Sequence, residues 1–233
     1  MNLRLLRKEA MEGDVVSFVF EAPDDFSWYP GQYMKYTLPH DNPDNRGIER
    51  WFTIAAPPDE KNPRITTRIF HDKPSSFKAA LNNLKPGDSV EAESPGGDFV
   101  LGDTSEDYAL IAGGIGITPF HAMLTSADHD GVMPNINLLY SVRTDKPLFY
   151  KELETLGSKY PSLKVQLLVE PNRISAENIR KFVPDVPKPR YYVSGPDAMV
   201  DAVQKMLLDM GVSAGNIELD YFSGYTWPLT TPN

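Results

Sequence analysis

The chain has 233 residues and a net charge of −9, so it is long enough for one large domain or two ordinary ones, and its acidic balance argues against nucleic-acid binding. It has no cysteine, which excludes disulfides, thiolate metal sites, cysteine nucleophiles and cysteine-ligated iron–sulfur clusters. The first residues lack the apolar core of a signal peptide, and glycines and Pro119 interrupt the one long uncharged stretch. We therefore expect a cytoplasmic protein without a transmembrane segment.

The first hundred residues predict short strands. Segments that alternate or end at prolines and other turn formers lie at residues 15–23, 32–39, 49–58, 64–70 and 89–101. One helix is predicted among them at residues 75–85, with Pro74 before it and Gly87 after it. Regularly spaced short strands indicate an antiparallel sandwich or barrel.

The pattern changes near residues 102–108, and from there strands alternate with helices. The predicted strands are 108–113, 136–142, 163–170, 190–195 and 216–222, and the predicted helices are 119–127, 148–160, 176–183 and 196–210. This alternation indicates crossover units and a doubly wound parallel α/β sheet. We place the domain boundary here and expect domains at residues 1–104 and 105–233.

The segment "LIAGGIGITPF" (110–120) predicts a strand, a glycine turn and a helix. We expect Thr118 to be the N-cap and Pro119 to be the first helical residue, where its fixed φ angle and missing N–H cost nothing. Gly114 and Gly116 would let the backbone approach a neighbour closely, and the free N–H groups of a helix start suit a phosphate. A structural turn without a ligand is the alternative.

A second turn repeats this logic in "YYVSGPDAM" (191–199), where Gly195 ends a strand and Pro196 starts a helix. Open α/β sheets bind ligands in a crevice at the carboxyl ends of their strands. We therefore expect the two turns to flank one crevice.

Four segments together resemble the ferredoxin–NADP reductase superfamily of flavin-dependent oxidoreductases. They are "PGQYMKYTLP", "RWFTIAAPP", "AGGIGITPF" and "VSGPDAM", which resemble an early barrel strand, the flavin signature, the pyridine-nucleotide motif and the Cys-Gly-Pro motif. The resemblance covers nearly the whole chain. It implies an antiparallel, Greek-key-like β-barrel that holds FAD, or FMN, followed by a Rossmann-like domain that binds NADH or NADPH.

The resemblance assigns flavin contacts to the first domain. Arg50 would pair with the flavin phosphates, next to Trp51 in the same signature; Phe52 would pack beside the isoalloxazine ring, and Thr53 would hydrogen-bond flavin N5. Strict alternation puts Thr53 on the face opposite Arg50 and Phe52, so the strand must bend or end there. A solvated Arg50 and a core Phe52 are the alternatives. The remaining flavin contacts would be Arg68, Ile69 and Phe70 on the next strand, and Ser75 and Ser76 at a helix start.

The resemblance also assigns nucleotide contacts. Gly114, Gly116, Thr118, Gly195 and Pro196 would face the nucleotide, and Ser194 takes the usual cysteine position beside the nicotinamide. An arginine such as Arg143, after the second strand, can hold a 2′-phosphate, but Asp145 lies close by, so the choice between NADH and NADPH stays open.

Aromatic residues crowd the chain end. The resemblance matches "DYFSG" to the family's acid-x-Phe-x-Gly ending, which implies that Phe222 covers the flavin ring. Neighbours on a strand face opposite sides, so Tyr221 would then point away. Tyr225 or Trp227 is expected to stack on the flavin or its adenine. The alternative is that all four pack a domain interface.

These features predict a flavoprotein reductase that passes hydride from NADH or NADPH to flavin and electrons onward to a protein such as ferredoxin or flavodoxin. The alternatives are an electron-transfer module of a larger oxygenase or membrane reductase complex, a free-flavin or ferric reductase, and a regulatory module without catalysis. No metal site is expected, since His40, His71, His121 and His129 show no ligand spacing.

Overall fold

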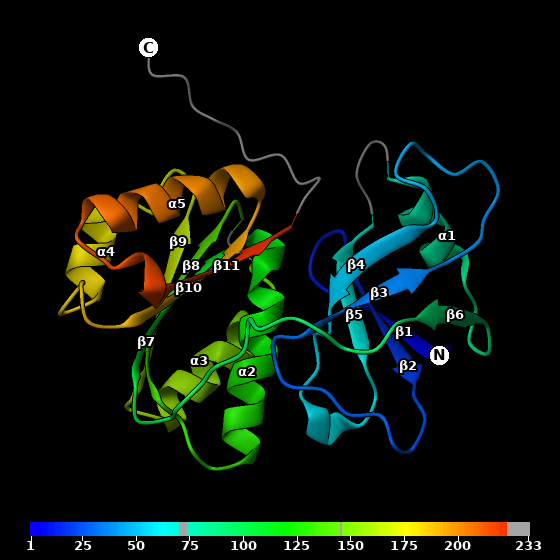
Figure 1. The fold of residues 1–233 in the computed structure, drawn as a ribbon, viewed down its shortest axis with the longest axis horizontal. Coiled ribbons are helices and arrows are strands. Elements are labelled where there is room, and N and C mark those ends of the chain that lie inside the picture. The colour runs from blue at the N-terminus through cyan, green and yellow to red at the C-terminus, as the bar shows by residue number, and fades with distance from the viewer. Residues whose placement is uncertain (70–73, 145, 223–233) are drawn as a thin grey trace. The chain divides into compact units, whose positions relative to one another are not determined.

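The computed structural model describes residues 1–69, 74–144 and 146–222. The chain divides into two compact units, of which the first comprises Met1–Val100 and His121–Ser126, and the second comprises the rest from Leu101 onward. Each unit carries its own sheet (Figure 1).

The first unit is built on a six-stranded antiparallel sheet in the order β4-β3-β6-β1-β2-β5. Its strands are β1 (Asn2–Ala10), β2 (Val15–Glu21), β3 (Tyr33–Thr37), β4 (Glu49–Thr53), β5 (Arg64–Arg68) and β6 (Ser89–Ala92). The Ala55 amide donates to the Arg64 carbonyl at 2.8 Å, so the two edge strands β4 and β5 approach each other. The sheet is therefore barrel-like, which confirms the predicted antiparallel barrel.

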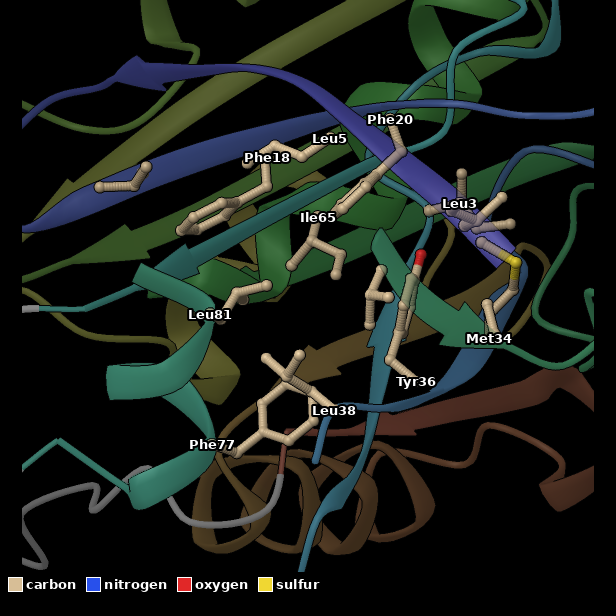
Figure 2. Packing of buried hydrophobic residues seen from close by; sticks show 14 of the residues in the cluster. Leu3, Leu5, Phe18, Phe20, Met34, Tyr36, Leu38, Ile65, Phe77 and Leu81 are labelled. Atoms are coloured by element: carbon tan, nitrogen blue, oxygen red, sulfur yellow. The ribbon is translucent and has the colours of Figure 1, made fainter. Parts of the chain in front are cut away.

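The core of this unit is filled by alternate residues of the strands and by the buried face of helix α1 (Ser76–Asn83). Figure 2 shows Phe18 and Phe20 of β2 facing Phe77 and Leu81 of α1 across the interior. The phenol oxygen of Tyr36 is buried with no hydrogen-bond partner among the described residues, and burial raises the Tyr36 pKa. An apolar interior of this kind holds β4 and the start of α1 in fixed positions.

Three parts of the first unit differ from expectation. The strand expected over residues 49–58 is shorter, since β4 ends at Thr53. Strand β1 was not predicted, although Leu3 and Leu5 are buried on either side of exposed Arg4. The strand expected over residues 89–101 is shorter than predicted, since β6 ends at Ala92 and only an isolated bridge from Gly96 to Tyr33 follows. Pro95, Gly96 and Gly97 in "SPGGD" leave no regular ladder there.

The second unit contains a five-stranded parallel sheet in the order β11-β10-β7-β8-β9. Its strands are β7 (Asp107–Gly113), β8 (Asn135–Val142), β9 (Leu163–Val169), β10 (Arg190–Gly195) and β11 (Ile217–Tyr221). The helices are α2 (Ile117–His129), α3 (Tyr150–Lys159), α4 (Ala176–Phe182) and α5 (Asp197–Asp209), with α4 and α5 on one face of the sheet and α3 on the other (Figure 1). The doubly wound α/β prediction is confirmed.

The order of these strands reverses between β7 and β10. The chain proceeds from β7 outward to β8 and β9, then returns to place β10 and β11 on the opposite side of β7. Such a reversal is where open α/β sheets bind ligands. Both predicted glycine turns follow the two strands that meet at this point. No helix among the described residues is long and apolar enough to cross a bilayer.

Candidate functional site

Arg50 of β4 is buried, and both terminal nitrogens of its guanidinium donate to groups of its own unit. Its side chain is only 6% exposed, and Nη1 donates to the carbonyls of Arg46, Gly47 and Glu49 at 2.8, 3.1 and 2.6 Å. Nη2 donates to Asp44 Oδ1 at 2.8 Å. The guanidinium also lies 5.5 Å from the ring centroid of Phe77. The structure thus rules out the alternative of a solvated arginine at a strand end.

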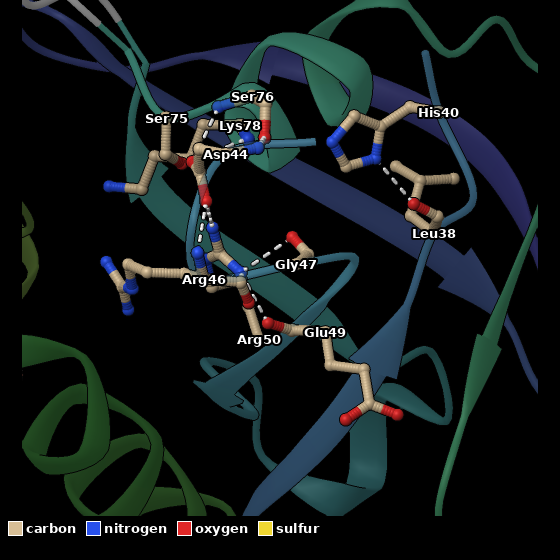
Figure 3. Close-up of polar contacts among 10 residues, drawn as sticks. All are labelled: Leu38, His40, Asp44, Arg46, Gly47, Glu49, Arg50, Ser75, Ser76 and Lys78. Atoms are coloured by element: carbon tan, nitrogen blue, oxygen red, sulfur yellow. Dashed lines mark hydrogen bonds and ion pairs between the residues drawn. The ribbon is translucent and has the colours of Figure 1, made fainter. Parts of the chain in front are cut away.

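Asp44 joins Arg50 to the amino terminus of α1 (Figure 3). Its Oδ2 accepts the Ser76 amide at 3.0 Å, its Oδ1 also accepts the Arg46 amide at 2.9 Å, and its own amide donates to Ser76 Oγ at 2.9 Å. Burial alone would raise the pKa of Asp44, but hydrogen bonds from Arg46, Ser76 and Arg50 outweigh it and lower that pKa to about 2. The carboxylate is therefore ionised, and sequence reasoning missed its role entirely.

Ser75 and Ser76 hold the start of α1 as the sequence indicates. Ser75 is the N-cap, with its hydroxyl accepting the Lys78 amide at 3.3 Å. Ser76 follows as the first helical residue, and its amide, which was expected to contact the flavin, donates to Asp44. The Ser76 amide at the start of α1 therefore donates to an anion, which is the Asp44 carboxylate.

The other residues of the flavin signature lie on both faces of β4. Phe52 is half-buried, 5.9 Å from the Tyr36 ring and 5.8 Å from the Phe77 ring, so it packs against the core. Trp51 points the other way, is 59% exposed and stacks edge-on with Tyr33. Thr53 is buried and is the last residue of β4, which confirms that the strand ends there.

The next predicted flavin strand contains β5, which approaches the end of β4 where the Ala55 amide donates to the Arg64 carbonyl. Arg68 pairs with Asp14 at 2.7 Å, and Ile69 is buried in the barrel core. Phe70 lies outside the described residues. Within the flavin prediction, β4 and α1 meet at Phe77, against which Arg50 and Phe52 both pack, and Ile69 belongs to the same core cluster.

The turn after β7 differs in detail from the prediction. A 3₁₀ turn, Gly114–Gly116, precedes α2, which begins at Ile117. Thr118 is therefore inside the helix, buried, and its hydroxyl donates to the Ile115 carbonyl at 3.1 Å, so it is not the N-cap. Pro119 is the third helical residue and not the first. The tight turn advances the helix by two residues, and the Thr118 hydroxyl satisfies the turn's carbonyl.

The glycines of the two turns bring β7 and β10 close together. A Cβ atom on Gly116 would lie 2.3 Å from the Ser194 carbonyl oxygen, and one on Gly195 would lie 3.2 Å from Gly113 Cα. Gly116 is thus required by the neighbouring backbone. Gly114 is different, since its φ is +56° and a Cβ there would meet nothing within 4 Å. Its surroundings leave room for a ligand.

Ser194 and Asp220 form a pair at the ends of adjacent parallel strands. Ser194 is fully buried, faces Asp220 across the β10–β11 ladder, and donates its hydroxyl to Asp220 Oδ2 at 3.0 Å. Burial raises the pKa of Asp220 to about 6, against the lowering effect of the Ser194 hydrogen bond. Asp220 was not predicted as a site residue; the acid before Phe222 in "DYFSG" was the available signal.

The remaining predicted residues end strands β8, β10 and β11. Arg143 follows β8 and is exposed. Pro196 is the N-cap of α5, and the Phe222 amide donates to the Gly195 carbonyl at 2.9 Å. Tyr221 turns toward α5 and donates to Asp201 at 3.0 Å. Tyr225 and Trp227 lie outside the described residues.

The second unit therefore gathers Gly116, Ser194, Gly195 and Phe222 around the switch point, with Arg143 one strand further along. Within the described residues, no cluster of three or more His, Asp or Glu side chains could hold a metal ion. The first unit can bind an anion through the Arg50 guanidinium and the Ser76 amide, close to the partly exposed ring of Phe52. The second unit can bind an anion through backbone amides of the turn after β7.

Comparison with known proteins agrees with this geometry. The model of the oxidoreductase NAD-binding domain matches residues 110–205. Flavohemoprotein B of Dictyostelium discoideum is 30% identical over 93% of this chain and 56% of its own length. A subunit of the Na(+)-translocating NADH-quinone reductase of Neisseria meningitidis is 28% identical over 88% of the chain and 56% of its own length.

A solved structure shares the whole fold. The flavohem-like FAD/NAD-binding domain of nitric oxide dioxygenase from Vibrio cholerae superposes with a TM-score of 0.79 at 23% identity, covering 95% of this chain and 98% of that one. The chain therefore has the fold of the ferredoxin–NADP reductase-like flavin-dependent oxidoreductases, and its second unit resembles an oxidoreductase NAD-binding domain. It spans little more than half the length of the curated relatives, 56% in both cases.

Proposed function

We propose that this chain is an electron-transfer module that binds FAD or FMN in its first unit and NADH or NADPH in its second. A bound flavin would supply the acceptor for hydride from the nicotinamide and would pass the electrons on. Ferredoxin, flavodoxin or another redox protein is the proposed acceptor. The observation that carries this function is the meeting of two glycine turns at the switch point, inside the segment that matches the NAD-binding model.

The residues of the first unit fit a flavin phosphate. The Arg50 guanidinium and the Ser76 amide already converge on one anion, and Arg50 Nε is buried without an acceptor among the described residues. A phosphate offers more acceptor oxygens than a carboxylate and suits a guanidinium fork. Phe52 and Thr53, which follow Arg50 on β4, are proposed to meet the isoalloxazine ring and its N5.

The residues of the second unit fit a nicotinamide nucleotide. Gly114 leaves room for a pyrophosphate beside the start of α2, where backbone amides favour an anion. Ser194, held by Asp220, is proposed to orient the nicotinamide, and Phe222, anchored on Gly195, to cover the flavin. Gly116 and Thr118 are proposed to shape the turn, and Gly114 is proposed to contact the nucleotide directly.

The length of the relatives favours a second candidate, a module of a larger electron-transfer assembly. One relative is a flavohemoprotein and another belongs to a sodium-translocating reductase, and the chain matches 56% of each. As such a module, the chain would be reduced normally by nucleotide and turn over slowly until its partner is added.

The test is the visible absorption spectrum of the purified protein, before and after incubation with FAD or FMN, followed by stopped-flow mixing with NADH and with NADPH. We expect a bound-flavin spectrum that bleaches with at least one nucleotide. A protein that binds no flavin, or whose flavin neither nucleotide bleaches, would favour the regulatory alternative. Fast oxidation of nucleotide by added free riboflavin or ferric chelate would favour the free-flavin or ferric reductase.

A further inference from the structure

The Arg50 cluster contains an anion of its own. Asp44 supplies both carboxylate oxygens to donors that come from separate elements, namely Arg50 of β4 and the Ser76 amide at the start of α1 (Figure 3). These are the donors that fit a phosphate, because a guanidinium and the amides of a helix start both favour negative charge. One carboxylate therefore lies where a phosphate group of a ligand would be held.

The two partners of this ion pair differ in burial. The Arg50 side chain is 6% exposed, whereas that of Asp44 is 28% exposed. Asp44 belongs to the segment between β3 and β4, so a change in that segment can remove the carboxylate while the strand keeps Arg50 in place. A buried guanidinium needs an anion at all times, and an internal carboxylate meets this need when no ligand is bound.

The cluster is also incompletely satisfied. Arg50 Nε is buried without a hydrogen-bond acceptor among the described residues, although Nη1 and Nη2 have four acceptors between them. Asp44 does not reach Nε, since its Oδ1 accepts from the Arg46 amide and Arg50 Nη2 and its Oδ2 accepts from the Ser76 amide. An anion with three or more oxygens can occupy the same position and also reach Nε.

We propose that the Asp44 carboxylate is an internal substitute for the flavin phosphate, and that FAD or FMN binds by exchanging its phosphate for Asp44 at Arg50 and the start of α1. This inference rests on the proposed function, because it takes the ligand to be a flavin. Asp44 then lowers the affinity for every flavin that carries a phosphate and leaves the affinity for riboflavin unchanged, since riboflavin has no group to exchange.

The test compares Asp44→Asn with the wild type and with Asp41→Asn. Asp41 lies in the same segment, is exposed and carries the same charge, so its substitution controls for the net charge of the protein. Dissociation constants for FAD, FMN and riboflavin are measured by flavin fluorescence quenching. We expect Asp44→Asn to bind FAD and FMN at least tenfold more tightly, with unchanged affinity for riboflavin, and Asp41→Asn to match the wild type for all three.

A measurement on the wild type guards against a variant that does not fold. Hydrogen–deuterium exchange of the peptide covering residues 39–48 is followed with FMN and with riboflavin. Release of Asp44 frees the Arg46 amide, so FMN should speed exchange in this peptide while riboflavin does not. Equal exchange with both flavins would overturn the inference.

The outcomes separate the inference from the proposed function. If the wild type binds riboflavin and FAD and NADH or NADPH reduces the bound flavin, but Asp44→Asn binds FAD no more tightly, then the exchange is wrong and the function stands. If neither protein binds any of the three flavins, both are wrong. If Asp41→Asn tightens FAD binding as much as Asp44→Asn does, the effect is one of net charge and the exchange is overturned.

Discussion

The two units differ in the groups that could bind an anion. The first presents a buried charge, the Arg50 guanidinium, and balances it with Asp44. The second has the glycine turn after β7, where the space beside Gly114 is empty and the Ser194 carbonyl lies against Gly116. A side-chain charge requires an internal counter-anion whenever no ligand is bound, whereas a backbone site requires only that no side chain fills it. Substitutions should therefore act through charge in the first unit and through space in the second.

The largest expected effect is in the second unit, at Gly116. Gly116→Ala would place a Cβ atom 2.3 Å from the Ser194 carbonyl oxygen, and because backbone cannot yield locally, β7 and β10 would have to separate. We expect a loss of roughly 2–4 kcal/mol in the free energy of unfolding. Chemical denaturation measures it.

Gly114→Ala is the matched control for this prediction. Its Cβ would meet no atom within 4 Å, and its only structural cost is a φ of +56°. We expect a smaller loss of about 1–2 kcal/mol, with weaker binding of NADH or NADPH. Equal destabilisation by the two substitutions would show that contact with Ser194 does not decide the requirement for glycine.

In the first unit, Arg50→Glu should strongly weaken the binding of flavins that carry a phosphate. It removes the guanidinium and places a second carboxylate beside Asp44, so we expect affinity for FAD to fall by about a hundredfold or more, since hydrogen bonds to charged groups contribute about 1.5–3 kcal/mol each. Gel filtration followed by the ratio of flavin to protein absorbance measures the loss. Circular dichroism checks that the fold persists, and an unchanged ratio would remove Arg50 from the flavin site.

Asp220 and Asp44 should respond to pH in opposite directions. Burial raises the pKa of Asp220 to about 6, so its contribution to stability is complete below the unfolded value of 3.8 and is lost as pH rises through 6. We expect the free energy of unfolding to fall by at most about 2–3 kcal/mol between pH 4 and 7 because of Asp220, and we expect this fall to be absent in Asp220→Asn. Urea denaturation of both proteins across this range tests it.

Asp44 supplies the contrast. Its pKa is lowered to about 2, so its contribution to stability is complete above 3.8 and is lost as pH falls toward 2. Asp44→Asn should therefore leave the dependence between pH 4 and 7 intact and reduce the acid instability below pH 4. The assignment of the two pKa shifts would be contradicted if Asp44→Asn removed the pH dependence of stability between pH 4 and 7, or if Asp220→Asn removed the loss of stability below pH 4.

The smallest expected effect concerns nucleotide choice. Arg143 is exposed just after β8, where a guanidinium can hold a 2′-phosphate. If it does, Arg143→Ala should raise KM for NADPH about tenfold to a hundredfold, the value of a charged hydrogen bond, and leave KM for NADH unchanged. Steady-state kinetics with both nucleotides measures this, and equal changes would mean that Arg143 does not distinguish them.

The sequence by itself determined the architecture and the position of the two glycine turns. Strand and helix periodicities, proline and glycine boundaries and the change of pattern near residue 102 are local properties, so the antiparallel unit and the parallel unit could both be predicted. The helix start at Ser75 was predictable for the same reason, whereas the local pattern extended the strand to residue 58, and only the flavin role implied for Thr53 required it to bend or end there.

Only the tertiary structure decided which groups meet. Asp44 contacts Ser76, 32 residues away, and Ser194 contacts Asp220, 26 residues away, and neither pair has a periodic signal in the sequence. Gly116 is required by the Ser194 carbonyl, which the sequence cannot place, and a 3₁₀ turn at Gly114–Gly116 puts Thr118 inside α2. Local patterns encode the conformation of each segment, whereas the partner of a buried charge or a missing side chain depends on how the sheet is assembled.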